Sequence, residues 1–182
     1  MRYLVTDVET GGFQGTSLLS AYFGLLDDKL NLIDELNLFV KPDDGIYAVT
    51  AEALGVNKIS LIEHDKVAIT YKEAGTKLYQ FLHKNYINGE KPLPLGHNVA
   101  FDVVRIKQDL ISEGSWNNFV SYRVVDTGTI GTYLKILGKI PSDISGSLSS
   151  YAKHFGIDFS GAHDAKNDCI MTTLVFKEML KL

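Results

Sequence analysis

The stretch RYLVTDV, residues 2–8, opens the chain and has the apolar, β-branched composition of a buried strand. Two more apolar runs follow at residues 17–26 and 30–40, and the turn-forming residues 27–29 separate them. Strands joined by so short a turn pair in antiparallel fashion. The first forty or so residues therefore predict a three-strand antiparallel meander.

The remainder of the chain alternates between helical and extended patterns. Residues 50–85 have helical spacing with an interruption near 56–64, and the run at 92–96 predicts a short strand that leads into a helix. A second short strand is expected at 121–125, and further helices at 127–137, 147–155 and 164–180. This order predicts an α/β fold, a mixed sheet flanked by helices, in a single domain over residues 1–182.

The composition is that of a soluble globular domain, with 182 residues of which 45% are hydrophobic and 22% charged. The single cysteine, Cys169, cannot form an internal disulfide, and no apolar run is long enough to cross a bilayer. We therefore expect a cytoplasmic protein that does not bind membranes. The net charge of −4 argues against a long grip on phosphate backbone and favours a short footprint.

A pair of carboxylates ends the first strand. Asp7 and Glu9 project to the same side because side chains alternate along a strand, and they repel each other unless a cation or a proton lies between them. A divalent metal ion suits that position, although a solvated strand end explains the pair as well. Gly11 and Gly12 then leave room for a ligand to approach the backbone, or form a plain turn.

Asp102 is the second candidate. It lies three residues after Val99 and four before Ile106, and it therefore flanks the stripe that a helix at this position would bury. From there its carboxylate can reach inward. The alternative is that Asn98 caps the helix and that Asp102 only favours its positive N-terminal end.

The third candidate is the start of the last helix, where Asp164 is a suitable cap. Asp168 heads the predicted buried face of this helix, which continues through Met171, Thr172, Val175 and Met179. His163 would lie in the loop before the cap and could overhang the site. A structural role is the alternative for this histidine.

Together the stretches DVETG at 7–11, HNVAFD at 97–102 and HDAKND at 163–168 resemble, in order and spacing, the three motifs of the DnaQ-like DEDDh exonuclease family. The resemblance spans nearly the whole chain. A sister branch has a tyrosine where Asp164 stands here, so the histidine branch is indicated. The resemblance implies a ribonuclease H-like fold with a mixed five-stranded sheet, in which the first strand is central.

The resemblance also implies a reaction. The chain would be a 3′→5′ exonuclease that releases nucleoside monophosphates from single-stranded nucleic acid, with two Mg²⁺ or Mn²⁺ ions as cofactors. In the two-metal scheme the attacking water and the departing 3′ oxygen each lie beside one cation. His163 would be the general base, and the implied metal ligands are Asp7, Glu9, Asp102 and Asp168.

Substrate contacts are expected, by the same resemblance, from Thr10, Gly11, Gly12, Asn98 and Phe101. Three other residues are open to interpretation. Phe13 could stack on a base, but an anchoring role for its loop is the favoured interpretation. Lys166 and Arg105 lie close to the motifs and could contact phosphates, although such residues often serve only solubility.

Two other functions compete with a DNA exonuclease, which is slightly favoured. An exoribonuclease that trims short RNA would share the catalytic residues, and a catalytically silent nucleic-acid-binding accessory module would share the fold. Beyond the 3′ end of a nucleic acid, the expected partner is a polymerase or a second copy of the chain.

Overall fold

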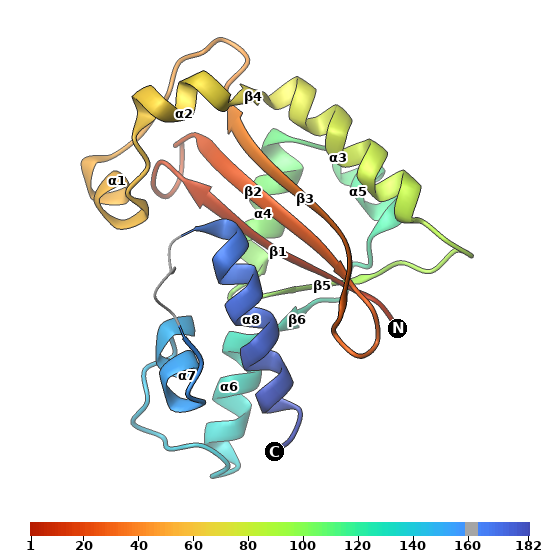
Figure 1. The fold of residues 1–182 in the computed structure, drawn as a ribbon, viewed down its shortest axis with the longest axis vertical. Helices are drawn as coiled ribbons and strands as arrows, with labels where there is room; N and C mark the ends of the chain where they lie inside the picture. The colour runs from red at the N-terminus through yellow and green to blue at the C-terminus, as the bar shows by residue number, and fades with distance from the viewer. Residues whose placement is uncertain (159–163) are drawn as a thin grey trace.

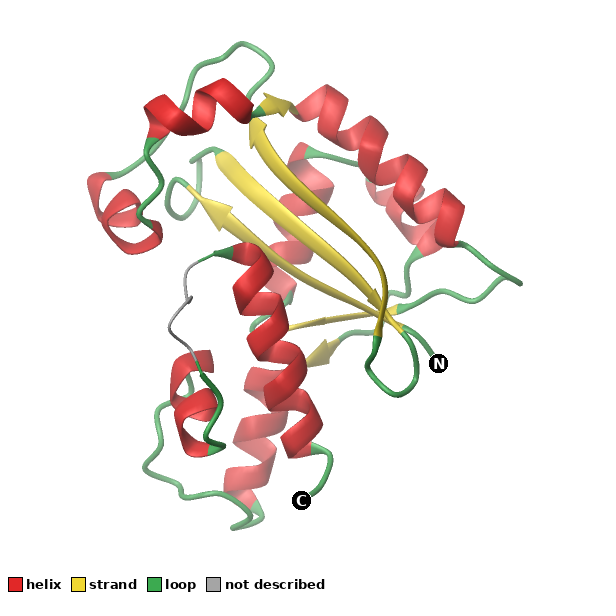
Figure 2. Cartoon of the chain, in the orientation of Figure 1, coloured by secondary structure: helices red, strands yellow, loops and turns green. Residues whose placement is uncertain are grey.

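The computed structural model describes residues 1–158 and 164–182. Its sheet, drawn in yellow in Figure 2, has the strand order β4-β3-β2-β1-β5-β6. The strands are β1 (Tyr3–Thr10), β2 (Leu18–Leu26), β3 (Leu32–Lys41), β4 (Ile69–Thr70), β5 (Leu93–Gly96) and β6 (Val125–Asp126). β1, β2 and β3 form the predicted antiparallel meander, and β5 and β6 continue the sheet in parallel. The mixed α/β sheet with a central first strand is confirmed.

Helices cover both faces of this sheet (Figure 1). They are α1 (Ala51–Asn57), α2 (Leu61–Val67), α3 (Tyr71–Asn85), α4 (Ala100–Asp109), α5 (Glu113–Phe119), α6 (Thr127–Ile136), α7 (Leu148–His154) and α8 (Ala165–Met179). α8 packs on β1 and β2 from one side, while α3 and α4 pack from the other. Within the described part of the chain, no helix combines the length and the apolar character needed to span a membrane.

Strand β1 separates two hydrophobic cores by the alternation of its side chains. Leu4 and Val8 belong to the larger core, which lies beneath α3, α4 and α5. Val5 points the other way and packs with Ala165 and Cys169 of α8. Residues with odd numbers in β1 therefore face α8, and this parity decides where the strand's carboxylates lie.

The structure departs from the sequence prediction mainly in its short elements. The strand expected at 121–125 is reduced to β6, because only Val125 and Asp126 align with β5. β4 adds a sixth strand of two residues beside the end of β3. α5 was not predicted, since within its seven residues only Trp116 and Phe119 are buried apolar side chains and so short a helix gives little periodicity.

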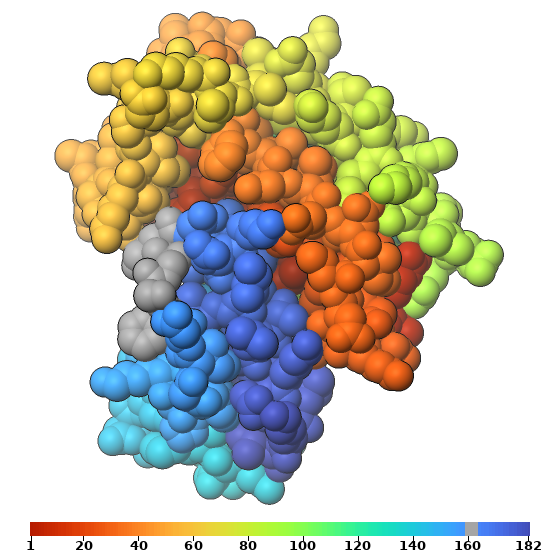
Figure 3. All heavy atoms as spheres, in the orientation of Figure 1, coloured from red at the N-terminus to blue at the C-terminus, as the bar shows by residue number. Residues whose placement is uncertain are grey.

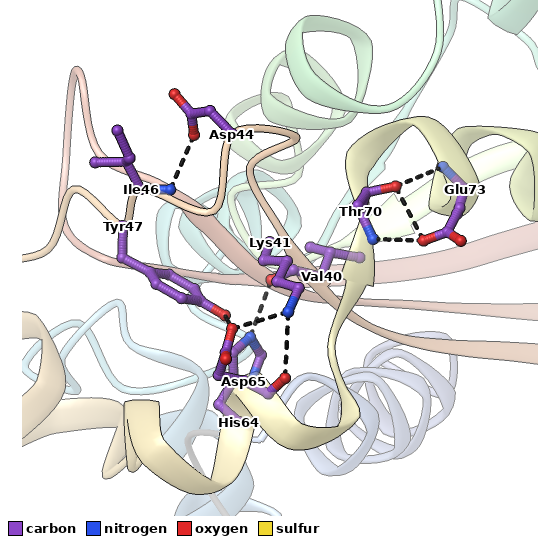
Figure 4. A network of polar contacts seen from close by, with 9 residues as sticks. All are labelled: Val40, Lys41, Asp44, Ile46, Tyr47, His64, Asp65, Thr70 and Glu73. Atoms are coloured by element: carbon purple, nitrogen blue, oxygen red, sulfur yellow. Dashed lines mark hydrogen bonds and ion pairs between the residues drawn. The ribbon is translucent and has the colours of Figure 1, made fainter.

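A polar network fixes α2 to the end of β3 (Figure 4). Lys41 Nζ lies 2.9 Å from Asp65 Oδ1, which also accepts a hydrogen bond from the Tyr47 hydroxyl at 3.2 Å. His64 Nε2 lies 2.9 Å from the carbonyl oxygen of Val40. That oxygen can only accept, so this ring nitrogen carries the hydrogen. The network holds the segment that leads into α1 and α2 against the sheet.

Close approach of two helices generates a prediction about stability. A Cβ atom added at Gly75 of α3 would lie 2.1 Å from the Leu110 carbonyl oxygen, a backbone atom just after α4. We expect Gly75→Ala to lower the free energy of unfolding by about 1–3 kcal/mol, the usual cost of overpacking. Urea denaturation measures it.

Gly114 in α5 is the matched control, because a Cβ atom there meets nothing within 4 Å. Gly114→Ala should leave the free energy of unfolding unchanged or raise it by up to about 1 kcal/mol. Equal effects of the two substitutions would contradict the close contact between α3 and the end of α4.

Candidate active site

Asp7 and Glu9 lie at the end of β1 on the face that α8 covers. Val5, which precedes Asp7 by two residues and Glu9 by four, packs against the first turns of α8. Because side chains alternate along the strand, both carboxylates lie on that same side. Asp168 comes from the first turn of α8. One carboxylate oxygen from each of Asp7, Glu9 and Asp168 lies within 4.8 Å of the others. Residues about 160 positions apart in sequence thus form one cluster.

Asp102 reaches the same strand from the opposite side. It lies in the first turn of α4, is only 4% exposed, and its Oδ1 accepts a hydrogen bond from the Val8 N–H at 3.0 Å. β5 pairs with β1 only at Tyr3, Leu4 and Val5. Beyond that point Asp102 therefore takes the place of a strand partner for β1. The alternative in which Asn98 caps the helix is wrong, because Val99 is the cap residue and makes no side-chain cap bond.

Burial and mutual repulsion raise the pKa values of these carboxyl groups. Burial raises the pKa of Asp7 well above its usual range, and the charges of Asp102 and Asp168 raise it further. Burial raises the pKa of Glu9 to about 7, with a contribution from Asp168. Burial also raises the pKa of Asp102 to about 8, although the hydrogen bond from Val8 opposes this effect. Each group resists ionisation while no cation compensates its charge.

A divalent cation fits this arrangement. Oxygen ligands at close mutual distance and of like charge are what hard cations such as Mg²⁺ and Mn²⁺ bind. Three carboxylates already supply such oxygens within 4.8 Å of one another. Binding a cation would also relieve the repulsion that raises their pKa values.

Asp164 is an acidic neighbour of the cluster, and the sequence patterns did not predict this position for it. It caps α8 as predicted, by accepting a hydrogen bond from the Lys166 N–H at 2.9 Å. Its charge also raises the pKa values of Asp7 and Glu9. The signal was available in the spacing, because Asp164 stands one helical turn before Asp168.

The thiol of Cys169 takes no part in this chemistry. Its side chain is buried in the core beneath α8. Burial raises the pKa of this thiol, and the charge of Asp7 raises it further. A thiol that resists ionisation in this way is a poor nucleophile.

A cavity of about 480 Å³ opens beside the carboxylates. Glu9 belongs both to its lining and to the acidic cluster. Apart from Glu9, its walls include Thr10, Gly12, Phe13, Thr16, Val56 and Phe101. In Figure 3, red atoms from the start of the chain lie recessed between the gold segment around α1 and the blue start of α8. The volume suits a small organic ligand or one unit of a polymer.

Two aromatic side chains at this cavity are open to solvent. Phe13 is 85% exposed and Phe101 is 41% exposed. The interpretation of Phe13 as an anchor for its loop is therefore wrong, because an anchor needs apolar contacts that an exposed ring does not make.

The glycines expected to contact substrate have different surroundings. A Cβ atom at Gly11 would lie 2.5 Å from the Ala48 carbonyl oxygen, so that the neighbouring backbone alone requires glycine there. Gly12 lines the cavity with φ of 144°, and its carbonyl oxygen accepts a hydrogen bond from Thr10 Oγ1 at 2.6 Å. Asn98 lies instead near Asp126, whose carboxylate accepts a hydrogen bond of 2.8 Å from the backbone N–H of Asn98.

The two basic residues near the motifs have partners within the protein. Lys166 Nζ lies 2.9 Å from Glu35 Oε1, so α8 is tied to β3. Arg105 is 9% exposed and its Nη2 lies 2.8 Å from Asp109 Oδ2. The suggestion that Arg105 contacts phosphates is wrong, since a buried guanidinium cannot reach a bound strand. His163 lies outside the described residues.

Comparison with protein-family models gives no match, and comparison with the sequences of curated proteins gives none either. Solved structures do match. Exonuclease I, in a structure that suggests how processivity is achieved, has a TM-score of 0.78 and 18% identity over 99% of this chain. E. coli exonuclease I in complex with a dT13 oligonucleotide has a TM-score of 0.76 and 19% identity over 98% of this chain.

The zinc-bound form of the E. coli exonuclease I complex with single-stranded DNA also matches, with a TM-score of 0.76 and 20% identity over 99% of this chain. In all three comparisons this chain covers 40% of the matched chain. The chain therefore has the ribonuclease H-like α/β fold of the part of exonuclease I that it matches.

Proposed function

We propose that the chain is a metal-dependent 3′→5′ exonuclease that releases nucleoside monophosphates from the end of a single strand, with DNA slightly preferred to RNA. The observation that carries the proposal is the meeting of Asp7, Glu9 and Asp168 within 4.8 Å, next to an open cavity with aromatic walls. Metal ions that carboxylates hold beside a site for one nucleotide can catalyse the hydrolysis of a phosphodiester bond.

Two further facts support this reading. The sequence resembles the DnaQ-like DEDDh family at three motifs, and the fold is that of exonuclease I, which has been solved with single-stranded DNA and with zinc. An identity of 18–20% carries the fold alone, so the assignment of chemistry rests on the residues of this chain.

We assign the metal ligands to Asp7, Glu9, Asp102 and Asp168, and the metals to Mg²⁺ or Mn²⁺. When bound, two such ions supply an activated water and stabilise the departing 3′ oxygen. The Val8 N–H orients Asp102, while the end of β1 and the first turn of α8 place the other three groups within 4.8 Å of one another. A phosphate is repelled by the carboxylates alone, so substrate binding depends on the cations.

The terminal nucleotide would occupy the cavity. Phe13 and Phe101 present exposed rings on which a base can stack, and stacking tolerates any base because each has a π face. Thr10 and Gly12 line the same space. In this scheme Gly11 has a structural role in the loop after β1, and Asn98 has a structural role in the turn before α4.

His163 is assigned the general base that accepts the proton of the attacking water. An imidazole with a reference pKa of about 6.5 is mostly neutral near pH 7 and can accept it. We base this assignment on the resemblance of residues 163–168 to the third motif of the family.

The first prediction concerns activity. The chain with Mg²⁺ or Mn²⁺ should shorten a 5′-labelled single strand from its 3′ end as a regular ladder on a gel, and chelator should stop it. Asp7→Asn should lower the rate by at least about 10³-fold, because the ligand charge is lost.

Asp28→Asn is the matched control, since Asp28 is exposed in the turn between β2 and β3. It should retain full activity. Parallel DNA and RNA strands of one sequence identify the preferred sugar. Tight binding of the strand without any shortening would replace the exonuclease by the silent binding module.

The second prediction tests the proton acceptor. His163→Ala should reduce kcat by about 10²–10⁴-fold and leave metal binding intact, because a general base contributes in that range. The rate of the unaltered chain should rise with pH through the histidine pKa, and the variant should lose this dependence. An unchanged rate would remove His163 from the mechanism.

The third prediction links pH, metal and stability. The folded state raises the pKa of Glu9 to about 7 and of Asp102 to about 8, from 4.5 and 3.8. Between these limits the folded chain binds more protons than the unfolded chain. In chelator these groups should therefore contribute most to the free energy of unfolding below about pH 4. This contribution is lost as the pH rises through about 7–8.

Urea denaturation at several pH values, with chelator and with Mg²⁺, measures this dependence. Glu9→Gln should flatten it in chelator, because the amide does not ionise. Added Mg²⁺ should raise the free energy of unfolding most at high pH, where the carboxylates are charged. Equal stability with and without metal at every pH would mean that the cluster does not bind it.

A further inference from the structure

We propose that Arg105 is a positioning residue for substrate binding: its buried guanidinium holds the turn between β1 and β2 that carries Phe13 at the cavity. The inference rests on the proposed function, because it takes the cavity as the place of the terminal nucleotide.

Arg105 makes its contacts inside the protein. Its side chain leaves α4 three residues after Asp102 and is almost fully buried. Nη2 donates a hydrogen bond of 2.6 Å to the carbonyl oxygen of Thr16 and lies 2.8 Å from Asp109 Oδ2. The carboxylate offsets the buried charge, while the carbonyl bond links α4 to the loop after β1.

Thr16 closes the turn that bears Phe13. Both its N–H, at 3.4 Å, and its Oγ1, at 2.7 Å, donate to the carbonyl oxygen of Phe13. The Phe13 ring is 85% exposed, so packing of the ring does not set its place. Its position follows from the backbone of the turn, and the turn is bonded to Arg105 through Thr16.

The two ends of this loop are held in another way. The Gly11 N–H donates to the Ser17 carbonyl oxygen at 2.8 Å, and the Thr50 N–H donates to the Gly11 carbonyl oxygen at 2.7 Å. The Ser17 N–H in turn donates to the Ala48 carbonyl oxygen at 2.8 Å. These bonds fix where the loop begins and ends. Within the loop, the Gly12 carbonyl oxygen accepts the bond from Thr10, and the bond from Arg105 to Thr16 connects the Phe13 turn to α4.

Helix α4 thus sets two walls of one cavity. Phe101 and Thr16 both line it, and Phe101 stands on the same helix as Arg105, four residues earlier. The helix places Phe101 directly and Phe13 through Arg105. Loss of the guanidinium should loosen the Phe13 side of the cavity and spare the carboxylates that hold metal.

The experiment removes both charges of the pair, because Asp109 left without its cation would destabilise the fold by itself. The double substitution Arg105→Met with Asp109→Leu should raise KM for a 5′-labelled single strand by about tenfold, while kcat changes by less than about threefold. Circular dichroism confirms that the variant is folded. Lys107→Met, on the same helix with its exposed partner Glu113, is the control and should change neither constant.

A cycle with Phe13→Ala tests the route of action. If Arg105 acts through the turn, the double substitution should raise KM by less than about twofold once Phe13 is already alanine. Independent, multiplicative effects would overturn the proposal, and so would a fall in kcat at constant KM. These results would place Arg105 in general stability or in the support of Asp102.

Two precautions separate this proposal from its premise. If the double variant fails to fold, Arg105→Lys is used instead, because lysine keeps a cation opposite Asp109 but lacks the planar, forked donors of a guanidinium. The KM of this variant should rise by a smaller factor. Should the unaltered chain bind single-stranded DNA without cutting it, the exonuclease fails, and the same variants are compared by Kd from fluorescence anisotropy. An unchanged Kd would then overturn the role of Arg105.

Discussion

Repulsion among carboxylates at the end of β1 is the constraint on which the rest of the structure depends. Asp7, Glu9, Asp102 and Asp168 come from one strand and two helices, and the charges of the other three raise the pKa of Asp7. Such a cluster opposes folding while it is charged. The surrounding elements must hold it by contacts made elsewhere, and the two hydrophobic cores on either side of β1 supply them.

Two helices meet this constraint by packing on β1 from opposite faces of the sheet. α8 packs on the side of Val5 and brings Asp168, while α4 packs on the other side and brings Asp102. Because β5 ends its pairing early, the Val8 N–H is left for Asp102 to bind. The short parallel strand and the buried aspartate are therefore parts of one arrangement, in which an unfinished ladder makes room for an acidic side chain.

Local patterns explain what the sequence predicts well. Alternation in β1 predicts that Asp7 and Glu9 share a face, and the helical stripe from Met171 to Met179 predicts that α8 buries the side headed by Asp168; the structure confirms both. These features depend on residues within a few positions of each other.

Features set by distant contacts escaped prediction. Arg105 carries the sign of a phosphate ligand in the sequence, yet its partners are Thr16 and Asp109. Phe13 has the apolar character of an anchor, yet the chain around it leaves the ring exposed. β4 and β6, with two residues each, owe their form to neighbouring strands and carry almost no signal of their own.

The parity of β1 restricts how this chain can vary in length. With a period of two residues, Val5 packs under α8 and the next two odd positions present Asp7 and Glu9 to that same face. Loss or gain of one residue between Val5 and Asp7 would turn both carboxylates toward the core of α3 and α4. Substitutions in this strand alter one side chain at a time, whereas a single-codon deletion would invert the chemistry of a whole face. Length variation should therefore accumulate in the surface loops and be purged from β1.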